Sequence, residues 1–486
     1  MKLQSAGYLA GIPLVCIGAA MLPALFFSLR WQDGAAGGIA WAVLCTMLAG
    51  GFLTLRGKKA RKNLFSRREA LAAVGLCWLS AGIAGALPFL LSHRLGFAEA
   101  FFESVSGFTT TGATILTNIE SLPASLLLWR SMTQWLGGMG IIVLSLAILP
   151  HLAVGGMQLY IAEVPGPNKD KLTPRMRDTA KTLWIVYGAL TLLMALALRL
   201  AGMSWYDAAN HSLTTLATGG FSTRNASMGA FSPLCQWIVI AFMLAAGLNF
   251  SLHCRFLRGA WNAYGKDEEC RAFLWLNLSC AAVVLALLCF RDAPESFSLA
   301  GLEQRARGAL FQVVSLCTST GFATENYAEW PAAACPVLLF VMFAGGCAGS
   351  TAGGFKIVRL LLLGKMLLRR LFLTLHQHAI RPVRLQNQSV PADVLEGIID
   401  FLLIFLAALS LFTFIIMLFD IDFLTAFSTV LTCISNVGPG LGRFGPADNG
   451  AWFPDALKII LSCAMLLGRL EFYAIVIMFV PEFWKK

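Results

Sequence analysis

Long apolar runs separated by short polar connections make up most of the chain. A helix needs about 20 predominantly apolar residues to cross the hydrocarbon core of a bilayer. The pattern therefore predicts an all-α polytopic membrane protein with ten spans. The predicted spans lie near residues 7–29, 37–55, 70–92, 124–150, 180–201, 232–254, 272–290, 333–371, 395–419 and 455–480.

A shorter, semi-apolar segment lies between the two spans of each pair that follows residue 70. These segments cover 98–111, 205–218, 306–320 and 422–437. They are too short to cross a bilayer, so they predict re-entrant helices. The chain then divides into an N-terminal two-helix extension and four helix–pore-loop–helix repeats with pseudo-symmetry around one central pore. The predicted boundaries are 1–69 for the extension and 70–155, 156–265, 266–385 and 386–486 for the repeats.

Each re-entrant segment leads into a polar stretch that contains threonine or serine and glycine, and in the fourth, asparagine and valine stand directly before the glycine. Self-similarity of this kind indicates a repeat architecture. We align the repeats on Gly112, Gly219, Gly321 and Gly438. Three of these glycines have an alanine twelve positions earlier, whereas Asp207 stands there in the second repeat.

Backbone that is not helical at membrane depth must be buried in protein or line a water-filled cavity. Glycine permits the backbone torsions and close approach that four converging loops require. Rings of carbonyl oxygens can replace the water shell of a potassium ion. The candidate ion ligands are Thr110, Thr111, Gly112, Thr218, Gly219, Ser319, Thr320, Gly321, Asn436, Val437 and Gly438. The alternative is that these residues are small contacts at helix crossings.

The predicted span 333–371 is too long for one crossing and holds a glycine-rich stretch. Each glycine costs a helix about 1 kcal/mol relative to alanine, so two half-helices joined by a loop are expected. Such a loop could block the pore, or it could be a kink that does not move. Arg469 lies in an otherwise apolar run, where a charge normally faces the interior or a water-filled path, unless it extends toward the inner surface. The candidate gating residues are Gly345, Gly346, Gly349, Ser350, Thr351, Gly353, Gly354, Lys356 and Arg469.

Composition supports a membrane protein, because 57% of the residues are hydrophobic, only 13% are charged and the mean hydropathy is +0.71. The net charge of +11 fits basic inner loops, and nucleic-acid binding is the weaker interpretation. Basic residues mark the inner side at Arg56–Lys62, 169–181, 255–271, 365–384 and 485–486, which places both termini inside.

Other classes of function find little support in the sequence. The thirteen cysteines are scattered, and there is no G-x-x-x-x-G-K-[ST] loop, so we expect no disulfide framework and no nucleotide bound by this chain. An enzyme would need convergent acids or a metal triad. Glu103 and Asp207 lie in re-entrant segments, where we expect them to attract cations at the outer mouth. A transporter of organic solutes would show two related halves with matching broken helices.

The four polar segments, the stretch Gln134–Gly140, the glycine-rich loop and Arg469 make the chain similar to the Trk/Ktr/HKT superfamily of potassium uptake proteins. The two extra N-terminal spans make it most similar to the TrkH branch. The resemblance implies a single-chain pore in which potassium, and rubidium, cross a bacterial inner membrane with both termini cytoplasmic. Relatives with serine at the first glycine favour sodium, so Gly112 points to potassium. Val437 departs from the threonine pattern.

The resemblance also implies an intramembrane gating loop, with Arg469 in the pore below the filter. It further implies a homodimer in the lipid bilayer and a cytoplasmic regulatory ring of the TrkA type that binds NAD and ATP. Whether the potassium ion moves alone or with a coupled proton stays open. A proton-coupled secondary transporter of potassium or another small solute is therefore the alternative.

Overall fold

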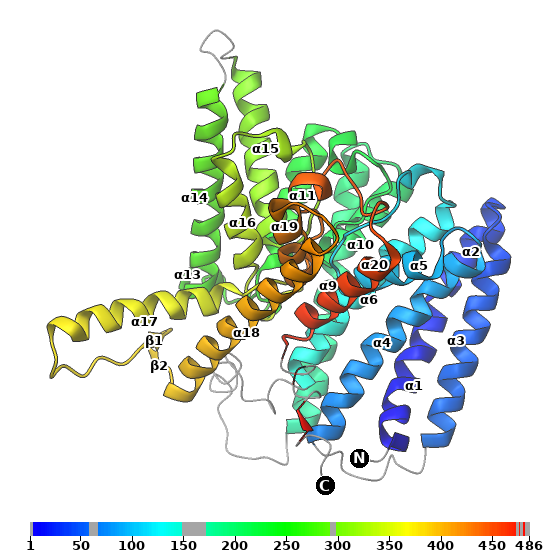
Figure 1. Ribbon diagram of the computed structural model, residues 1–486, viewed down its shortest axis with the longest axis horizontal. Helices are drawn as coiled ribbons and strands as arrows, with labels where there is room; N and C mark the ends of the chain where they lie inside the picture. Colours follow the sequence, from blue (N-terminus) through cyan, green and yellow to red (C-terminus); the bar gives the residue numbers. More distant parts are fainter. Residues whose placement is uncertain are drawn as a thin grey trace.

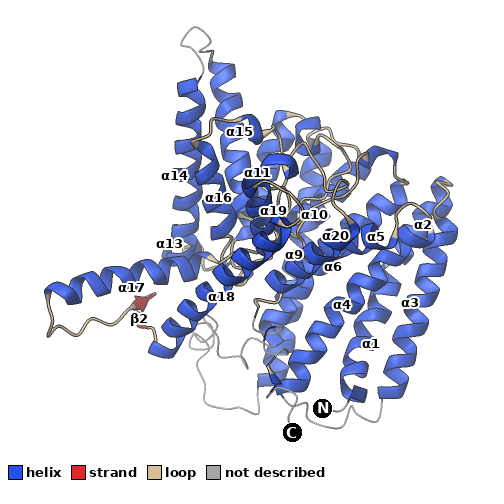
Figure 2. Cartoon of the chain, in the orientation of Figure 1, coloured by secondary structure: helices blue, strands red, loops and turns tan. Residues whose placement is uncertain are grey.

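The computed structural model describes residues 3–57, 67–147, 172–291 and 298–472, together with 476, 480 and 481. Within these residues the chain is almost entirely helical, as predicted (Figure 1, Figure 2). The basic residues in 58–62, together with 169, 171, 485 and 486, lie outside the described residues, as do both termini and residues 473–475 and 477–479 of the predicted span 455–480.

The N-terminal extension forms a helical hairpin against the first repeat. It consists of α1 (Leu3–Ala20), α2 (Leu22–Trp31) and α3 (Ala36–Gly57). Helices α1 and α3 approach closely at Gly11 and Gly50, because a Cβ atom on either glycine would come within 2.9 Å of the other's carbonyl oxygen. Small residues that let two backbones touch are typical of helix pairs in membranes.

The helices of the four predicted repeats follow in chain order, and each predicted repeat has a long helix, a shorter helix and a second apolar element. Repeat 1 has α4 (Arg67–Leu91), α5 (Phe97–Phe108) and α6 (Ala124–Ala147); repeat 2 has α9 (Leu172–Leu200), α10 (Trp205–Leu216), α11 (Pro233–Gly247) and α12 (Phe250–Leu257); repeat 3 has α14 (Glu268–Arg291), α15 (Leu299–Cys317), α16 (Ala334–Ala344) and α17 (Ile357–Leu375); repeat 4 has α18 (Ala392–Met417), α19 (Phe423–Ser435) and α20 (Asp455–Arg469). A short helix α13 (Ala263–Lys266) precedes repeat 3.

Six of the described helices are long and apolar enough to cross a membrane, or seven if the bent pair α11 and α12 counts as one span. The other three predicted spans are α6, the pair α16 and α17, and α20. Helix α16 has 11 residues and α20 has 15, each too short to cross alone.

Two of the second elements are interrupted. Helices α11 and α12 meet at an angle of 99°, where Asn249 caps α12 through its side chain and accepts a hydrogen bond from the N–H of Ser251. The sequence analysis expected an interruption only in repeat 3, so this second break is a correction. In repeat 3, α16 and α17 are two helices joined by the loop 345–356, and α17 extends sideways from the bundle (Figure 1).

A small hairpin, β1 (Arg384–Leu385) and β2 (Gln388–Ser389), follows α17. Its two turn residues, Gln386 and Asn387, both have positive φ, which is typical of the tight turns that match the twist of a hairpin.

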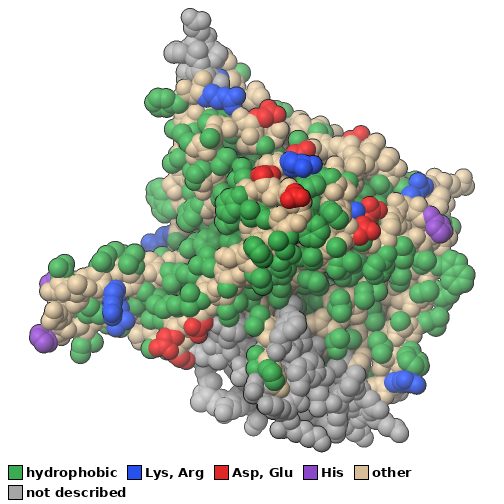
Figure 3. All heavy atoms as spheres, in the orientation of Figure 1, with side chains coloured by type: hydrophobic (Ala, Val, Ile, Leu, Met, Phe, Trp, Pro, Cys, Tyr) green, Lys and Arg blue, Asp and Glu red, His purple; other side chains and the backbone are tan. Residues whose placement is uncertain are grey.

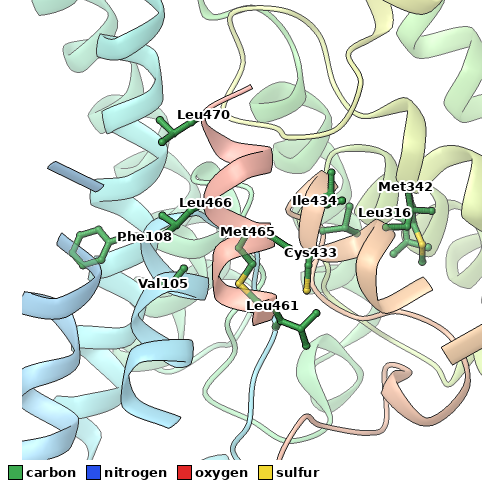
Figure 4. Packing of buried hydrophobic residues seen from close by; sticks show 14 of the residues in the cluster. Val105, Phe108, Leu316, Met342, Cys433, Ile434, Leu461, Met465, Leu466 and Leu470 are labelled. Atoms are coloured by element: carbon green, nitrogen blue, oxygen red, sulfur yellow. The ribbon is translucent and has the colours of Figure 1, made fainter. Parts of the chain in front are cut away.

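Helix α20 packs between α5 and α19, in the middle of the molecule. Figure 4 shows Met465 and Leu466 of α20 among Val105 and Phe108 on one side and Cys433 on the other. The outer surface is also largely apolar. Its exposed apolar side chains form a broad band, with charged groups mainly above and below it (Figure 3). Such a band fits a bilayer.

Candidate functional site

The four shorter helices α5, α10, α15 and α19 begin with capped N-termini. Helix α15 begins at Leu299 and has 19 residues, so it is longer than the predicted segment 306–320. Ser204, Ser298 and Asp422 each accept a hydrogen bond of 3.0 Å from a backbone N–H one turn on. At α5, the N–H of Gly96 instead donates to Glu99 at 3.1 Å. The bonds from Thr425 lower the pKa of the Asp422 carboxyl group. A defined start fixes where each short helix points.

The same four helices end in one shared conformation. Just past the C-terminal end of each helix, one residue has a left-handed backbone with φ between 52° and 54°. These residues are Thr110, Thr218, Ser319 and Asn436. The next residue in each repeat donates its N–H to a carbonyl five positions back: Thr111 to Ser106 (2.9 Å), Gly219 to Thr214 (2.9 Å), Thr320 to Ser315 (2.8 Å) and Val437 to Thr432 (2.8 Å). This is the Schellman arrangement, which terminates a helix and turns the chain.

The glycine that follows has positive φ in all four segments, at Gly112, Gly220, Gly321 and Gly438. The second repeat is therefore shifted by one residue from the alignment made on Gly219. With Gly220 as the equivalent glycine, Ala208 takes the place twelve positions earlier, and the irregularity at Asp207 disappears. Gly219 instead matches Thr111, Thr320 and Val437.

The four segments form a closed ring in chain order. A Cβ atom on Gly112 would collide with the carbonyl oxygen of Gly219, one on Gly220 with that of Thr320, one on Gly321 with that of Val437 and one on Gly438 with that of Thr111. Each glycine thus faces the carbonyl of the next segment. All four glycines also line one outward cavity, whose wall includes Thr114, Arg224 and Asp448.

Segments 1 and 3 are braced internally. The hydroxyl groups of Thr109 and Thr111 lie 2.7 Å apart, and those of Thr318 and Thr320 lie 2.8 Å apart. Segments 2 and 4 lack this threonine pair. In segment 4, the Asn436 amide donates to the Thr111 hydroxyl at 2.9 Å and to the Met465 carbonyl at 3.0 Å, which links it to segment 1 and α20.

The glycine spacing G-x-G-x-x-G occurs past segment 4, at 440–445. It follows a helix and lies around the short turn Gly442–Phe444. The strand–turn–helix setting of a dinucleotide site is therefore missing at this place.

The two acidic residues of the re-entrant helices are engaged with the protein. Glu103 is 1% exposed and forms an ion pair with Arg130 at 2.5 Å. Asp207 accepts from the hydroxyl of Thr223 at 2.6 Å and lies 3.5 Å from the Arg224 guanidinium group. Glu103 also accepts from the N–H of Ile115 at 3.2 Å, so both carboxylates hold the return legs of their segments. That they attract cations at the outer mouth stays a prediction.

The loop 345–356 is closed at its base. The N–H of Phe355 donates to the carbonyl of Phe343 and that of Lys356 to Ala344, both at 2.9 Å. Gly345, Gly349 and Gly354 have positive φ, and Gly345 and Gly354 pack against each other at the base of the loop.

The stretch 351–353 of this loop lies against the ends of three of these short helices. The N–H of Gly353 donates to the Ser319 hydroxyl at 2.6 Å, and the Thr351 hydroxyl donates to the Leu216 carbonyl at 3.1 Å. A Cβ atom on Gly353 would collide with the Ser435 carbonyl. Gly346 and Ser350 pack within the loop, and Lys356 donates its ammonium to the Ala352 carbonyl.

Arg469 connects this loop to repeat 1. It is 3% exposed and donates to the carbonyls of Thr351 at 2.9 Å and Gly137 at 3.4 Å. It therefore lies in the interior and does not extend to the surface. Glu471 pairs with Arg359 at 2.5 Å and not with Arg469, as its position two residues on predicts.

A carboxylate and a bent helix hold the sides of the loop. Glu269, at the start of α14, accepts from the N–H groups of Ala348 at 2.7 Å and Val358 at 3.2 Å. At the bend between α11 and α12, the Gly247 carbonyl accepts from Cys347 at 2.9 Å, and the N–H of Phe250 donates to Gly349 at 3.1 Å. The two interrupted helices therefore contact each other. The contact of Glu269 has no counterpart in the sequence pattern, because it joins positions 79 residues apart.

Comparison with known proteins agrees with the fold. The family model TrkH, described as a cation transport protein, matches residues 39–486. The Trk system potassium uptake protein TrkH of Salmonella typhimurium is 42% identical over 96% of both chains, and that of Escherichia coli K12 is 40% identical over the whole of both. These relatives are named as uptake proteins and not as enzymes.

A solved structure gives the same result. The crystal structure of the potassium transporter TrkH from Vibrio parahaemolyticus superimposes with a TM-score of 0.90 at 35% identity, and each chain is covered completely. The family predicted from the polar segments is thus confirmed over nearly the whole chain. The protein belongs to the TrkH family of cation transport proteins.

Proposed function

We propose that this chain takes up potassium, and also rubidium, through a gated pore whose selectivity filter is lined by backbone carbonyls. The observation that carries this proposal is the ring in which each positive-φ glycine faces the carbonyl of the next segment. The relatives named above are potassium uptake proteins.

The physical argument begins with dehydration. An ion that leaves water needs replacement ligands, and rings of carbonyl oxygens supply them for potassium. The candidate ligands come from the four segments: residues 110–112, 218–220, 319–321 and 436–438. The C-terminal ends of α5, α10, α15 and α19 carry partial negative charge, which favours a cation on that side of the ring. Gly112, where serine would favour sodium, points to potassium.

We infer that the loop 345–356 is the gate. Its stretch 351–353 contacts the ends of α10, α15 and α19, so the loop occupies the side of the ring on which these helices end. The buried guanidinium group of Arg469 adds a positive charge beside it, which raises the barrier for a passing cation. Opening then requires the Thr351 carbonyl to separate from Arg469, or both to move.

The setting follows from the same proposal. The chain acts in a bacterial inner membrane, with both termini cytoplasmic, as a homodimer. A cytoplasmic ring of the TrkA type, which binds NAD or ATP, controls the loop. The relatives' name, "Trk system", fits a protein that works with partners.

A proton-coupled secondary transporter of potassium or another small solute is the second candidate. The bend between α11 and α12 favours it, because interrupted helices in more than one repeat are typical of such transporters. The closed ring of four segments, which a transporter with two related halves does not need, favours the pore.

Ion flux in proteoliposomes tests the proposal. The purified protein should pass potassium and rubidium and should discriminate against sodium, and adding the regulatory ring with nucleotide should change the rate. Equal flux of the three ions would reject the filter. Potassium accumulation that requires a pH gradient would favour the coupled transporter.

A further inference from the structure

The position before each ring glycine differs in one segment. Thr111, Thr320 and Val437 are β-branched, whereas the fourth equivalent is Gly219. β-branched residues are stiff at χ1, which limits the conformations of the chain around them. The backbone of Gly219 does not have positive φ, so its conformation does not require glycine.

Space explains why glycine stands there. A Cβ atom on Gly219 would collide with the side-chain amide of Gln134, which projects from α6 of repeat 1. Gln134 is completely buried. A side chain from another repeat thus fills the volume that the residue's own side chain fills in the other three segments.

The amide of Gln134 holds segment 2 at two points. Its Nε2 donates to the carbonyl oxygen of Gly219 at 2.5 Å, and its Oε1 accepts from the N–H of Phe221 at 3.1 Å. One donor and one acceptor fix which way the amide is oriented. Among the hydrogen bonds of the described residues, Gly219 has the one ring carbonyl that accepts from a side chain.

Arg130, one helical turn earlier on α6, extends this contact. Its Nη1 donates to the Ser222 carbonyl at 3.0 Å, and its guanidinium group lies 3.6 Å from the centre of the Phe221 ring. Helix α6 therefore holds the return leg of segment 2 at residues 219, 221 and 222. Segments 1 and 3 need no such support, because each has its own threonine pair.

We propose that Gln134 is a positioning residue that determines ion specificity: it orients the Gly219 carbonyl as one of the four ring ligands. This inference rests on the proposed function of the ring as a potassium filter. A carbonyl oxygen has two lone pairs, so it can accept from Gln134 and still face an ion. Removing the amide leaves a glycine backbone with more conformations at one of four ligands.

The test uses the full-length protein in liposomes and measures the potassium-to-sodium permeability ratio. Gln134→Ala removes the amide, and Gln134→Met keeps a similar length without a donor or acceptor. Both should lower the ratio about tenfold, which corresponds to about 1.4 kcal/mol. Gly219→Thr alone should also lower it, because the new side chain meets Gln134.

The double variant Gln134→Ala/Gly219→Thr decides the matter. It places a β-branched residue where the other three segments have one, and it removes the Gln134 amide that would collide with the new side chain. It should restore the ratio to within about threefold of wild type, a coupling that independent positions do not show. Melting temperature and elution volume, measured for every variant, separate loss of fold from loss of specificity.

Two results would overturn the inference: an unchanged ratio in Gln134→Met, or a double variant no better than the worse single variant. Should Gln134→Ala and Gln134→Met fail to fold, the double variant compared with wild type gives the same decision. Wild-type protein that passes sodium as well as potassium would refute the proposed function itself. A selective wild type with no rescue would refute only the role of Gln134.

Discussion

The ring and the elements packed around the loop 345–356 differ in how alike the four repeats are. In the ring, each repeat contributes the same Schellman turn, the same left-handed residue and the same positive-φ glycine. Around the loop, the repeats are unlike: only repeat 3 contributes the loop itself, repeat 2 contributes a bend, and repeat 4 contributes Arg469.

This difference follows from what a filter and a gate would each have to do. Four similar ligands must surround one ion, so a filter constrains every repeat in the same way. An obstruction needs to come from one direction only, so a gate leaves the other repeats free to act as supports. Ion selection should therefore be sensitive to any repeat, and gating mainly to repeats 3 and 4.

One methyl group should break the equivalence of the ring. In Gly220→Ala, the Cβ atom meets the Thr320 carbonyl at a residue with φ of +76°. We expect potassium flux to fall on the order of a hundredfold, or about 2.8 kcal/mol. Gly188→Ala in α9 is the control, because no atom lies near its new Cβ. Normal flux in Gly220→Ala would show that this glycine does not shape the path of the ion.

Shortening 345–354 should remove the main difference between repeat 3 and the other repeats, which is the loop itself. Deleting 346–353 joins Gly345 to Gly354, which already pack together, so α16 and α17 can keep their places. Basal flux without the regulatory ring should rise about tenfold, equivalent to about 1.4 kcal/mol. Arg469→Ala removes the contact with Thr351 from the other side and should act in the same direction. Unchanged flux after the deletion would count against the loop as the gate.

Serine substitutions at two ring glycines should show whether the segments of the ring are equivalent in ion specificity. Gly112→Ser places a side chain against the Gly219 carbonyl and should lower the potassium-to-sodium ratio about fivefold, or about 1 kcal/mol. Gly220→Ser should reduce it similarly if the segments are equivalent. Flux of both ions in liposomes measures this, and no change in Gly112→Ser would exclude that glycine from the filter.

The smallest expected effect concerns the support of the loop. Glu269→Gln replaces charge-assisted hydrogen bonds to Ala348 and Val358 by neutral ones, which are roughly half as strong. Basal flux should rise about twofold. Glu268→Gln is the control, because that carboxylate contacts Lys365 and Gln386 and not the loop. An equal effect of the two substitutions would remove Glu269 from the gate.

The sequence predicts the elements of this fold well, because their signals are local. The ends of the re-entrant helices, the broken span of repeat 3 and the inward position of Arg469 all follow from apolar runs, glycines and one buried charge. The equivalence of Gly220, rather than Gly219, to the other ring glycines does not follow from the sequence. Only the backbone torsions distinguish these two adjacent glycines. The alanine at position 208 was the available signal.

Contacts between repeats were beyond sequence reasoning. Gln134 reaches Gly219 across 85 positions, and Asn436 reaches Thr111 across 325. The pairing of Glu103 with Arg130 is a further contact, between residues 27 positions apart, that a local pattern does not show. A local sequence pattern does not distinguish a carboxylate that faces solvent from one that is buried in an ion pair.

The closed base of the loop 345–356 has a consequence for the history of such proteins. Since the backbones of Phe343 and Phe355 already meet, the stretch between them is an insert on a finished framework. Doubling the length of a flexible insert costs only about 0.6 kcal/mol in closure entropy. The length of this loop can therefore differ among related proteins at a small cost in closure entropy, while the helices around it keep their places.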